Sequence, residues 1–226
     1  MKRFQNRKEA GEQLAQTLLS LASIQGTELR ILALPRGGVP VAVEIAVALR
    51  APLDVLVVRK LGVPWQPELA FGAVATGNVQ VINQEMVQTL SLSEEVIRRI
   101  AASEMVELQR REELYRGNRP ALDVKGCAAI LVDDGIATGA TILAAVEAVR
   151  RRQPASVIVA VPVAPPEVVR LLKTRTDEVV TIVEPKWLNA VGAWYWDFPQ
   201  VTDEEVRTLF RQTRVAAGAM QQMNKL

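Results

Sequence analysis

Short apolar runs alternate along the chain with segments whose apolar residues recur three and four positions apart. The runs are typical of buried strands, which we expect at Leu29–Leu34, Leu53–Val58, Cys127–Val132, Ser156–Val161 and Glu178–Val183. The helical spacing predicts helices at Arg7–Ser23, Val39–Leu49, Ser91–Arg116, Ala140–Arg152 and Glu167–Thr174. Because buried strands alternate with helices, the pattern predicts an α/β fold with a mostly parallel sheet covered on both faces.

Two stretches depart from this alternation. Residues 61–70 hold two prolines and a glycine and predict a loop. Phe71–Ala75 and Val79–Ile82 flank a Thr-Gly-Asn segment, which predicts a hairpin. Near the end of the chain, Thr202 and the acidic residues after it match a capping box, so we expect a last helix that ends near Ala217.

The composition limits the chemistry that this fold can carry. The chain has 226 residues, of which 49% are hydrophobic and 23% are charged, which is typical of a globular protein with one large domain. There is no histidine, which excludes Ser-His-Asp and Cys-His catalysis and His-ligated metal sites. The only cysteine, Cys127, can form no disulfide within the chain and suits a reducing cytoplasm.

Charge and hydropathy limit the partners. The net charge of +2 argues against a dedicated nucleic-acid binder. No apolar run approaches the ~20 residues that cross a bilayer. The charged N-terminal segment is not followed by the apolar core of a signal peptide. We therefore expect a cytoplasmic protein with no membrane partner.

The most informative motif spans Ala129 to Thr141 and reads Ala-Ile-Leu-Val-Asp-Asp-Gly-Ile-Ala-Thr-Gly-Ala-Thr. A buried strand here delivers Asp133 and Asp134 to the carboxyl edge of the sheet, where such sheets bind ligands. Carboxylates at this place suit the hydroxyls of a sugar, or water molecules on Mg²⁺. The small residues that follow open a helix, whose free N–H groups and dipole form an anion site. Carboxylates that suit a pair of sugar hydroxyls, next to a turn that suits a phosphate, indicate a site for ribose 5-phosphate.

This stretch resembles the phosphoribosyl pyrophosphate (PRPP) signature of type I phosphoribosyltransferases. That signature has four apolar residues, two acids, two variable residues, a small or acidic residue and then Thr-Gly-x-Thr, and every position fits. The resemblance covers about residues 29–200. It implies a central, mostly parallel sheet flanked by helices, in a single domain over residues 1–226. The core would lie at about 29–183, with a small hood at about 184–200, terminal helices, and a hairpin or loop insertion.

The resemblance assigns a role to each matched residue. Asp133 and Asp134 would bind the ribose hydroxyls and, through water, Mg²⁺. The 5-phosphate would lie on the turn formed by Ala137, Thr138, Gly139, Ala140 and Thr141. In the hypoxanthine-type enzymes an aspartate stands in place of Ala137 and helps to protonate the base. That mechanism therefore lacks its proton donor here, unless another group such as Glu68 supplies it.

Two further motifs resemble pyrophosphate-binding segments of the family. The first strand is followed by Leu-Pro-Arg-Gly-Gly-Val-Pro, where a short family loop binds pyrophosphate and often holds a non-proline cis peptide. This resemblance implicates Pro35, Arg36, Gly37 and Gly38. Arg59 and Lys60 close the second strand before a segment that resembles the closing loop of the adenine-type enzymes. Both cations would meet the leaving pyrophosphate, although Ala70 stands where those enzymes have a glutamate.

Five of the ten aromatic residues lie between Trp187 and Phe198. In the family the hood grips the acceptor base, and aromatic faces stack on planar bases. We expect the base to lie between this segment and the loop that the resemblance extends over residues 61–72, which carries Trp65 and Phe71. Trp194 is the first candidate for stacking, because small residues precede it. Packing in the core or in a dimer interface stays open for each ring.

Together with the resemblance, these residues imply a phosphoribosyltransferase. It would use Mg²⁺-PRPP to transfer ribose 5-phosphate to a nitrogenous base and release pyrophosphate, with Asp133, Asp134, Arg59 and Lys60 as catalytic candidates. The alternative is a regulator of the same fold that senses PRPP or a nucleotide without turnover. The sequence leaves open which base is the acceptor and whether the protein is a homodimer.

Overall fold

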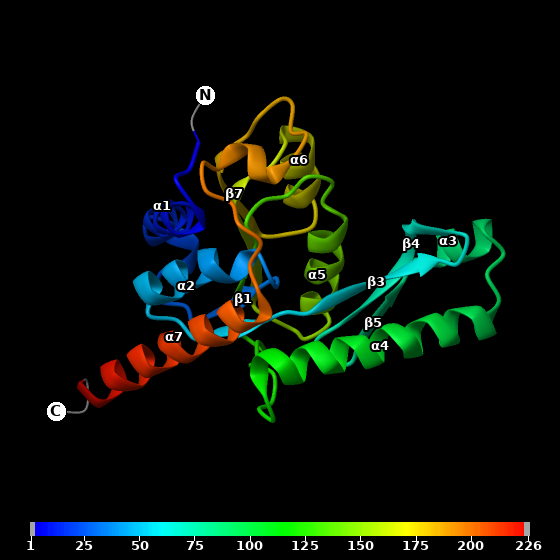
Figure 1. The fold of residues 1–226 in the computed structure, drawn as a ribbon, viewed down its shortest axis with the longest axis horizontal. Helices are drawn as coiled ribbons and strands as arrows, with labels where there is room; N and C mark the ends of the chain where they lie inside the picture. The colour runs from blue at the N-terminus through cyan, green and yellow to red at the C-terminus, as the bar shows by residue number, and fades with distance from the viewer. Residues whose placement is uncertain (1–2, 224–226) are drawn as a thin grey trace.

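The five apolar runs form one sheet in the computed structural model, which describes residues 3–223 apart from the side chains of residues 67, 68 and 214–223 (Figure 1). All neighbouring strands are parallel, in the order β2-β1-β6-β7-β8. The strands are β1 (Leu29–Ala33), β2 (Leu53–Val55), β6 (Ala128–Val132), β7 (Ser156–Val163) and β8 (Glu178–Val183). The predicted α/β fold with a parallel sheet is therefore confirmed.

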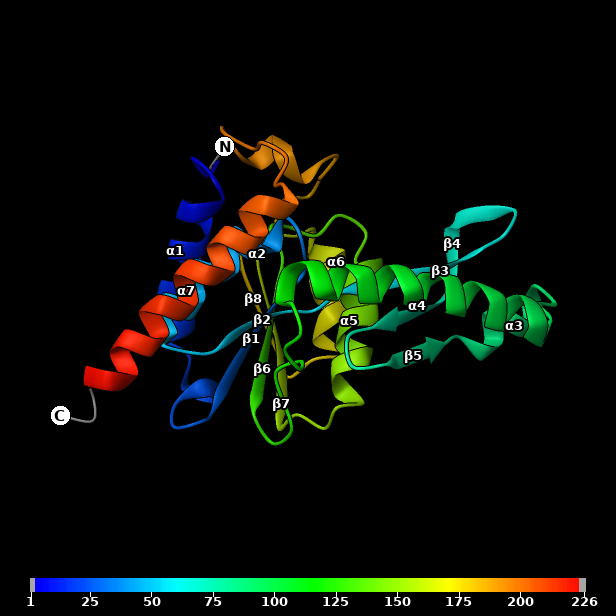
Figure 2. The ribbon, with the colours of Figure 1, turned by 60° about the horizontal axis from the view of Figure 1, so that its bottom comes forward.

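Helices cover both faces of this sheet (Figures 1 and 2). One face carries α1 (Arg7–Leu19) and α2 (Gly38–Leu49), with α7 (Asp203–Met223) packed against α2, and the other face carries α5 (Ala140–Arg150) and α6 (Pro166–Lys173). Side chains alternate along each strand, so Ile31 and Ala33 pack in the first layer while Leu32 packs in the second. Burial on both faces explains why the strands are continuous apolar runs.

The segment between β2 and β6 forms an arm that projects from the parallel sheet (Figures 1 and 2). It contains an antiparallel sheet in the order β3-β4-β5 and two helices. The elements of the arm are β3 (Val58–Val63), β4 (Gln66–Ala75), β5 (Val79–Ile82), α3 (Gln84–Thr89) and α4 (Glu94–Arg116). The predicted hairpin is confirmed as β4 and β5, and the long predicted helix as α4. The short helix α3 was not predicted.

Residues 61–70 are not a loop, and this prediction is wrong. They form most of a hairpin between β3 and β4, with a tight turn that begins at Pro64. The pairing shifts register on both sides of Gly62, and such bulges let a strand accommodate irregular residues. β5 pairs only with residues 72–75, so Pro67, which has no N–H to donate, lies where β4 has a partner on one side only.

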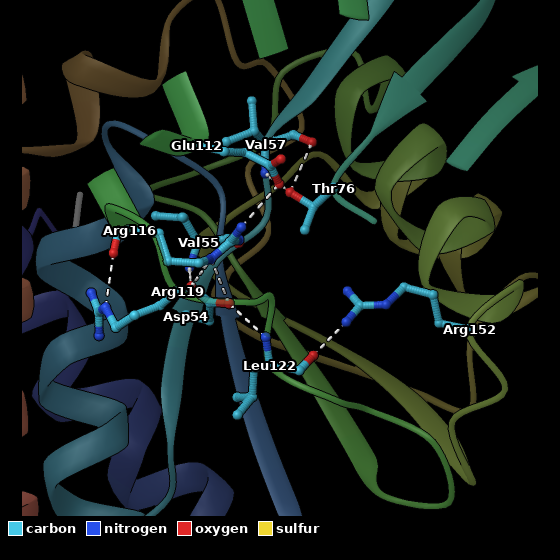
Figure 3. Close-up of polar contacts among 9 residues, drawn as sticks. All are labelled: Asp54, Val55, Val57, Thr76, Glu112, Arg116, Arg119, Leu122 and Arg152. Carbon is cyan, nitrogen blue, oxygen red and sulfur yellow. Dashed lines mark hydrogen bonds and ion pairs between the residues drawn. The ribbon is translucent and has the colours of Figure 1, made fainter. Parts of the chain in front are cut away.

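The predicted strand Leu53–Val58 is divided between the two sheets. β2 ends at Val55 and β3 begins at Val58. Between them, the N–H of Val57 donates to Thr76 Oγ1 at 2.9 Å, and the N–H of Thr76 donates to the carbonyl of Val57 at 2.9 Å (Figure 3). One apolar run therefore serves two sheets.

A buried ion pair ties α4 to the edge strand β2 (Figure 3). Arg116, which is 7% exposed in the last turn of α4, donates through Nε to both carboxylate oxygens of Asp54 at 3.0 and 3.1 Å. Its other nitrogens donate to the carbonyl of Val55 at 3.0 Å and to Glu112 at 3.1 Å. Asp54 also accepts the N–H of Leu122 at 2.8 Å. This network fixes the base of the arm to the parallel sheet.

The predicted capping box opens α7. The N–H of Thr202 donates to Glu205 Oε2 at 2.7 Å, and the N–H of Glu205 donates to Thr202 Oγ1 at 3.1 Å. The helix runs to Met223, beyond the predicted end near Ala217. Two short 3₁₀ helices, η1 (Ala22–Ile24) and η2 (Val191–Trp194), follow α1 and β8. Within residues 3–223, no helix is both long enough and apolar enough to cross a bilayer.

Candidate active site

The two strands that precede the main motifs are neighbours in the sheet. From β1 the chain passes through α2 to β2 on one side, whereas β6 lies against β1 on the other side. The carboxyl ends of β1 and β6 therefore form a topological switch point, where doubly wound sheets bind ligands. The N–H of Leu34 donates to the carbonyl of Val132 at 2.8 Å across this point. The segments after both strands are thereby brought side by side.

Two glycines after β1 lie directly against the acid pair after β6. A Cβ atom on Gly37 would lie 2.1 Å from Asp134 Oδ2, and a Cβ atom on Gly38 would lie 2.8 Å from the Cα of Asp133. A side chain at Gly37 would displace the Asp134 carboxylate, and one at Gly38 would displace the backbone of Val132 and Asp133. The peptide bond between Pro35 and Arg36 is cis, as the resemblance implies for the loop that binds pyrophosphate.

Each carboxylate of the acid pair has a defined partner. Asp133 Oδ1 accepts the N–H of Asp134 at 2.9 Å. Asp134 Oδ2 accepts a hydrogen bond from Arg7 Nε at 2.8 Å, within an ion pair whose two side chains are largely buried. The hydroxyl of Tyr195 donates to the backbone carbonyl of Asp134 at 2.6 Å. The pair is thus held by one cation and by hydrogen bonds from two directions.

Burial controls the protonation of these groups. It raises the pKa of Asp133, and the neighbouring charge of Asp134 raises it further. Burial also raises the pKa of Asp134, whereas the hydrogen bond and charge of Arg7 oppose that shift. The pKa of Tyr195 is raised by burial, so its hydroxyl stays protonated and donates at neutral pH. The buried acid pair therefore favours cationic or hydroxyl-bearing ligands.

The predicted phosphate turn connects the acid pair to α5. The N–H of Ile136 donates to the carbonyl of Val163 at 2.9 Å and fixes the start of the turn. Gly139, with φ +81°, is the N-cap of α5 and supplies a backbone angle that other residues rarely adopt. Thr138 and Thr141 are exposed beside it, as are Ala137 and Ala140. The first turn of α5 therefore presents N–H groups and hydroxyls to the solvent, as an anion site requires.

Comparisons with known proteins identify the family of this chain. The family model of the phosphoribosyl transferase domain matches residues 2–198. The chain belongs to the phosphoribosyl transferase domain family. It is 47% identical over 206 residues to a Mycobacterium tuberculosis H37Rv protein named "Putative phosphoribosyl transferase Rv0571c". The match covers 91% of this chain and 46% of that protein, so this chain spans about half the length of its curated relative.

A solved structure is similar over almost its whole length. The crystal structure of TT1426 from Thermus thermophilus has 43% sequence identity and a TM-score of 0.83. The match covers 93% of this chain and 98% of that chain. The overall fold of this chain is thus similar to that of a solved protein from Thermus thermophilus.

In this phosphoribosyl transferase domain, Arg36 lies beside the terminal helix α7. Its Nη1 is 3.8 Å from Asp203 Oδ1, and both side chains are partly exposed. The same oxygen of Asp203 accepts the hydroxyl of Tyr115, from the end of α4, at 2.6 Å. Arg36 therefore lies in the turn after β1, next to the glycines that contact the acid pair, and its guanidinium has Asp203 as counter-ion.

Arg59 and Lys60 lie on β3 in the arm. Arg59 Nη2 is 2.6 Å from Glu104 Oε2 on α4, so its charge is directed toward the arm helix. Both cations line a cavity of about 380 Å³ that also includes Arg99 and Pro64. The structure therefore brings Arg59 and Lys60 together beside α4, and the ion pair of Arg59 is with Glu104 and not with the acid pair. Their role as pyrophosphate ligands stays a prediction.

The aromatic residues divide into buried and exposed rings. Trp194 is 7% exposed and packs in a cluster with Phe4 and Tyr195, which favours core packing over stacking on a base. The small residues before it do not open a ligand approach, because a Cβ atom on Gly192 would lie 2.8 Å from the ring of Phe198. Phe71, which we expected beside the base, is fully buried. Trp65, Trp187 and Trp196 are 66%, 87% and 68% exposed.

Sequence reasoning missed Arg7, which contacts the acid pair, and Tyr195, which was counted only among the aromatic rings. Arg7 occupies the same buried face of α1 as Ala10, Leu14 and Leu18. A charged residue on an otherwise apolar stripe was the available signal, since such residues are rarely buried without a partner. For Tyr195 nothing in the local pattern distinguishes a hydroxyl on the site from a ring in the core.

Proposed function

We propose that this domain transfers ribose 5-phosphate from PRPP to a nitrogenous base and releases pyrophosphate. The observation that carries the proposal is the contact between the acid pair and the glycine turn. Gly37 leaves no space for a side chain beside Asp134, and both lie at the switch point of the sheet. A sugar that binds the carboxylates then has its pyrophosphate over the Pro35–Gly38 turn and its 5-phosphate toward α5.

Different residues of the site would bind the three parts of PRPP. Asp133 and Asp134 accept the ribose hydroxyls, and the turn from Ala137 to Thr141 binds the 5-phosphate. Arg36 exchanges Asp203 for the pyrophosphate. Hydrogen bonds to charged groups in a partly buried site are about twice as strong as neutral ones. The three parts of PRPP therefore have separate and chemically matched binding groups.

Catalysis would rest on orientation and charge. The bond between C1 of the ribose and the pyrophosphate oxygen breaks, and a bond from C1 to a nitrogen of the base forms. Positive charge develops on the ribose in between, so a fixed substrate and excluded water contribute most to the rate. The carboxylates face this charge, while Arg36 faces the departing negative charge.

The donor set suits Mg²⁺ that is bound together with substrate. Among the described residues, no three His, Cys, Asp or Glu side chains converge to form a metal site made of protein ligands alone. Mg²⁺ usually keeps several waters and binds through one or two carboxylates plus substrate phosphates. Asp133 and Asp134 supply the two carboxylates. The ion would neutralise negative charge on the pyrophosphate of PRPP.

The acceptor would lie between the hood and the phosphate turn. Trp187 follows the carboxyl end of β8, at the same edge of the sheet as the acid pair, and its ring is 87% exposed. An exposed ring at this edge can stack on a planar base. Ala137 supplies no proton, so we expect weak activity with hypoxanthine and guanine. The side chain of Glu68, named above as another proton donor, lies outside the described residues.

The test is a screen of nucleobases with PRPP and Mg²⁺, with pyrophosphate release as the signal. Asp134→Asn should abolish the release, whereas Asp123→Asn, an exposed acid before β6, should leave it unchanged. Release that is insensitive to Asp134→Asn would contradict the proposed site. Tight PRPP binding without release from any base would support the regulator that senses PRPP.

A further inference from the structure

We propose that Arg7 is a positioning residue of the ribose site, which holds the carboxylate of Asp134 from the first turn of α1. The inference rests on the proposed function, because it assigns the ribose hydroxyls to that carboxylate. It adds the N-terminal helix to a site that otherwise consists of segments following β1 and β6.

Three contacts fix the guanidinium group. Arg7 Nε donates to Asp134 Oδ2 at 2.8 Å, and Nη1 donates to the carbonyl of Pro199 at 2.7 Å. The guanidinium carbon lies 3.6 Å from the centroid of the Phe198 ring, which is the geometry of a cation–π contact. Arg7 itself is 8% exposed. A planar group held from three directions has one orientation, and so has the carboxylate that it binds.

The helix does not need this cation for its own packing. α1 is already anchored by the buried side chains of Ala10, Leu14 and Leu18. Phe4 adds a backbone hydrogen bond to Trp194 at 2.9 Å. A buried ion pair is often no more stabilising than apolar residues of similar volume. The buried position of Arg7 is therefore best explained by its contact with the carboxylate of Asp134.

The contact with Arg7 leaves one oxygen of the Asp134 carboxylate available to a ligand. Arg7 engages Oδ2, so the second oxygen, Oδ1, can accept a hydrogen bond from a sugar hydroxyl. The hydroxyl of Tyr195 holds the backbone carbonyl of the same residue at 2.6 Å. One partner thus fixes the main chain of Asp134 and the other fixes its side chain. The charge of Arg7 also reduces the repulsion between Asp133 and Asp134, which are adjacent and largely buried.

The test measures the affinity for PRPP with Mg²⁺ by calorimetry, together with thermal unfolding. Arg7→Met should weaken PRPP binding by about tenfold or more, the range for loss of a charge-assisted contact. Arg7→Lys should restore part of the affinity, because it returns the charge without the planar geometry. Arg3→Met is the matched control, since Arg3 stacks on Trp196 at 4.9 Å in the same segment. It should change the affinity by less than about twofold.

A double-mutant cycle separates positioning from general stability. If Arg7 acts through Asp134, Arg7→Met should have almost no further effect on PRPP affinity in an Asp134→Asn background. Equal losses in both backgrounds would overturn the inference. So would wild-type affinity in Arg7→Met, whereas a wild-type protein that binds no PRPP would overturn the proposed function itself. Should Arg7→Met not fold, Arg7→Lys is compared with Arg7→Gln, and equal PRPP affinity of these two would overturn the inference.

Discussion

The carboxyl edge of the parallel sheet and the arm both carry charged residues next to their strands, but the charges have different partners. At the edge, Asp134 and Arg36 are paired with residues of the two terminal helices, Arg7 and Asp203. In the arm, Arg59 is paired with Glu104 of the arm's own helix. The edge therefore gathers segments from the whole chain around one place, whereas the arm neutralises Arg59 within itself. The difference agrees with the proposed ligand site at the edge and with a structural role for the ion pair of the arm.

The largest effect should come from removing the buried ion pair of Arg116 and Asp54 at the base of the arm. Arg116→Met leaves Asp54 buried without its cation, which should lower the free energy of unfolding by about 3–5 kcal/mol. Urea denaturation followed by circular dichroism would measure it. The combined variant Arg116→Met with Asp54→Leu should recover much of the loss, because it removes the unpaired charge. PRPP affinity of the folded fraction should stay near that of the wild type, and a parallel loss of affinity would show that arm and edge form one unit.

The edge itself should also be sensitive to a side chain at Gly37. Gly37→Ala places a methyl group where Asp134 Oδ2 now lies, so the carboxylate must move by more than an ångström. Displacements of this size can lower the rate by about 100-fold. Pyrophosphate release is the measurement. Gly126→Ala is a control far from the site, where φ +70° should cost about 1–2 kcal/mol of stability with little change in the rate.

Each of the two regions has an exposed tryptophan that can stack on the acceptor base. They are Trp187 at the edge and Trp65 in the arm. Trp187→Ala should raise the acceptor KM by about tenfold, since stacking on a base contributes about 1–3 kcal/mol. Trp65→Ala, on the turn of the arm, should leave the KM unchanged. Steady-state kinetics at saturating PRPP would decide between them. The reverse result would mean that the arm, and not the hood, covers the base.

The smallest effect is expected at Arg59. Arg59→Ala removes a partly exposed ion pair, which contributes less than about 1 kcal/mol to stability. With Arg59 turned toward Glu104, kcat and the KM for PRPP should change by less than about threefold. A loss of kcat beyond tenfold would instead place Arg59 on the leaving pyrophosphate, as the family resemblance implies. Glu104→Gln would then raise the affinity for PRPP, because it releases the cation.

The sequence predicts the edge well and the tip of the arm at residues 61–70 poorly, for a physical reason. Asp133, Asp134 and Gly139 follow a buried strand and open a helix, so their placement depends on local pattern and on the strand-end rule. Residues 61–70 become a hairpin only through the bulge at Gly62 and the cover of α4, which are long-range effects. For Trp194, composition cannot distinguish a ring in the core from a ring in a pocket.

The contact among Tyr115, Asp203 and Arg36 has a consequence for how this protein is divided into parts. The family match ends at residue 198, but Asp203 belongs to the helix beyond it and supplies the counter-ion of Arg36. The same helix buries Val206 and Phe210 in the main core. A chain cut at the family boundary would expose apolar surface and leave Arg36 without its counter-ion. We therefore expect that a stable fragment of this protein must include α7, which lies beyond the family match.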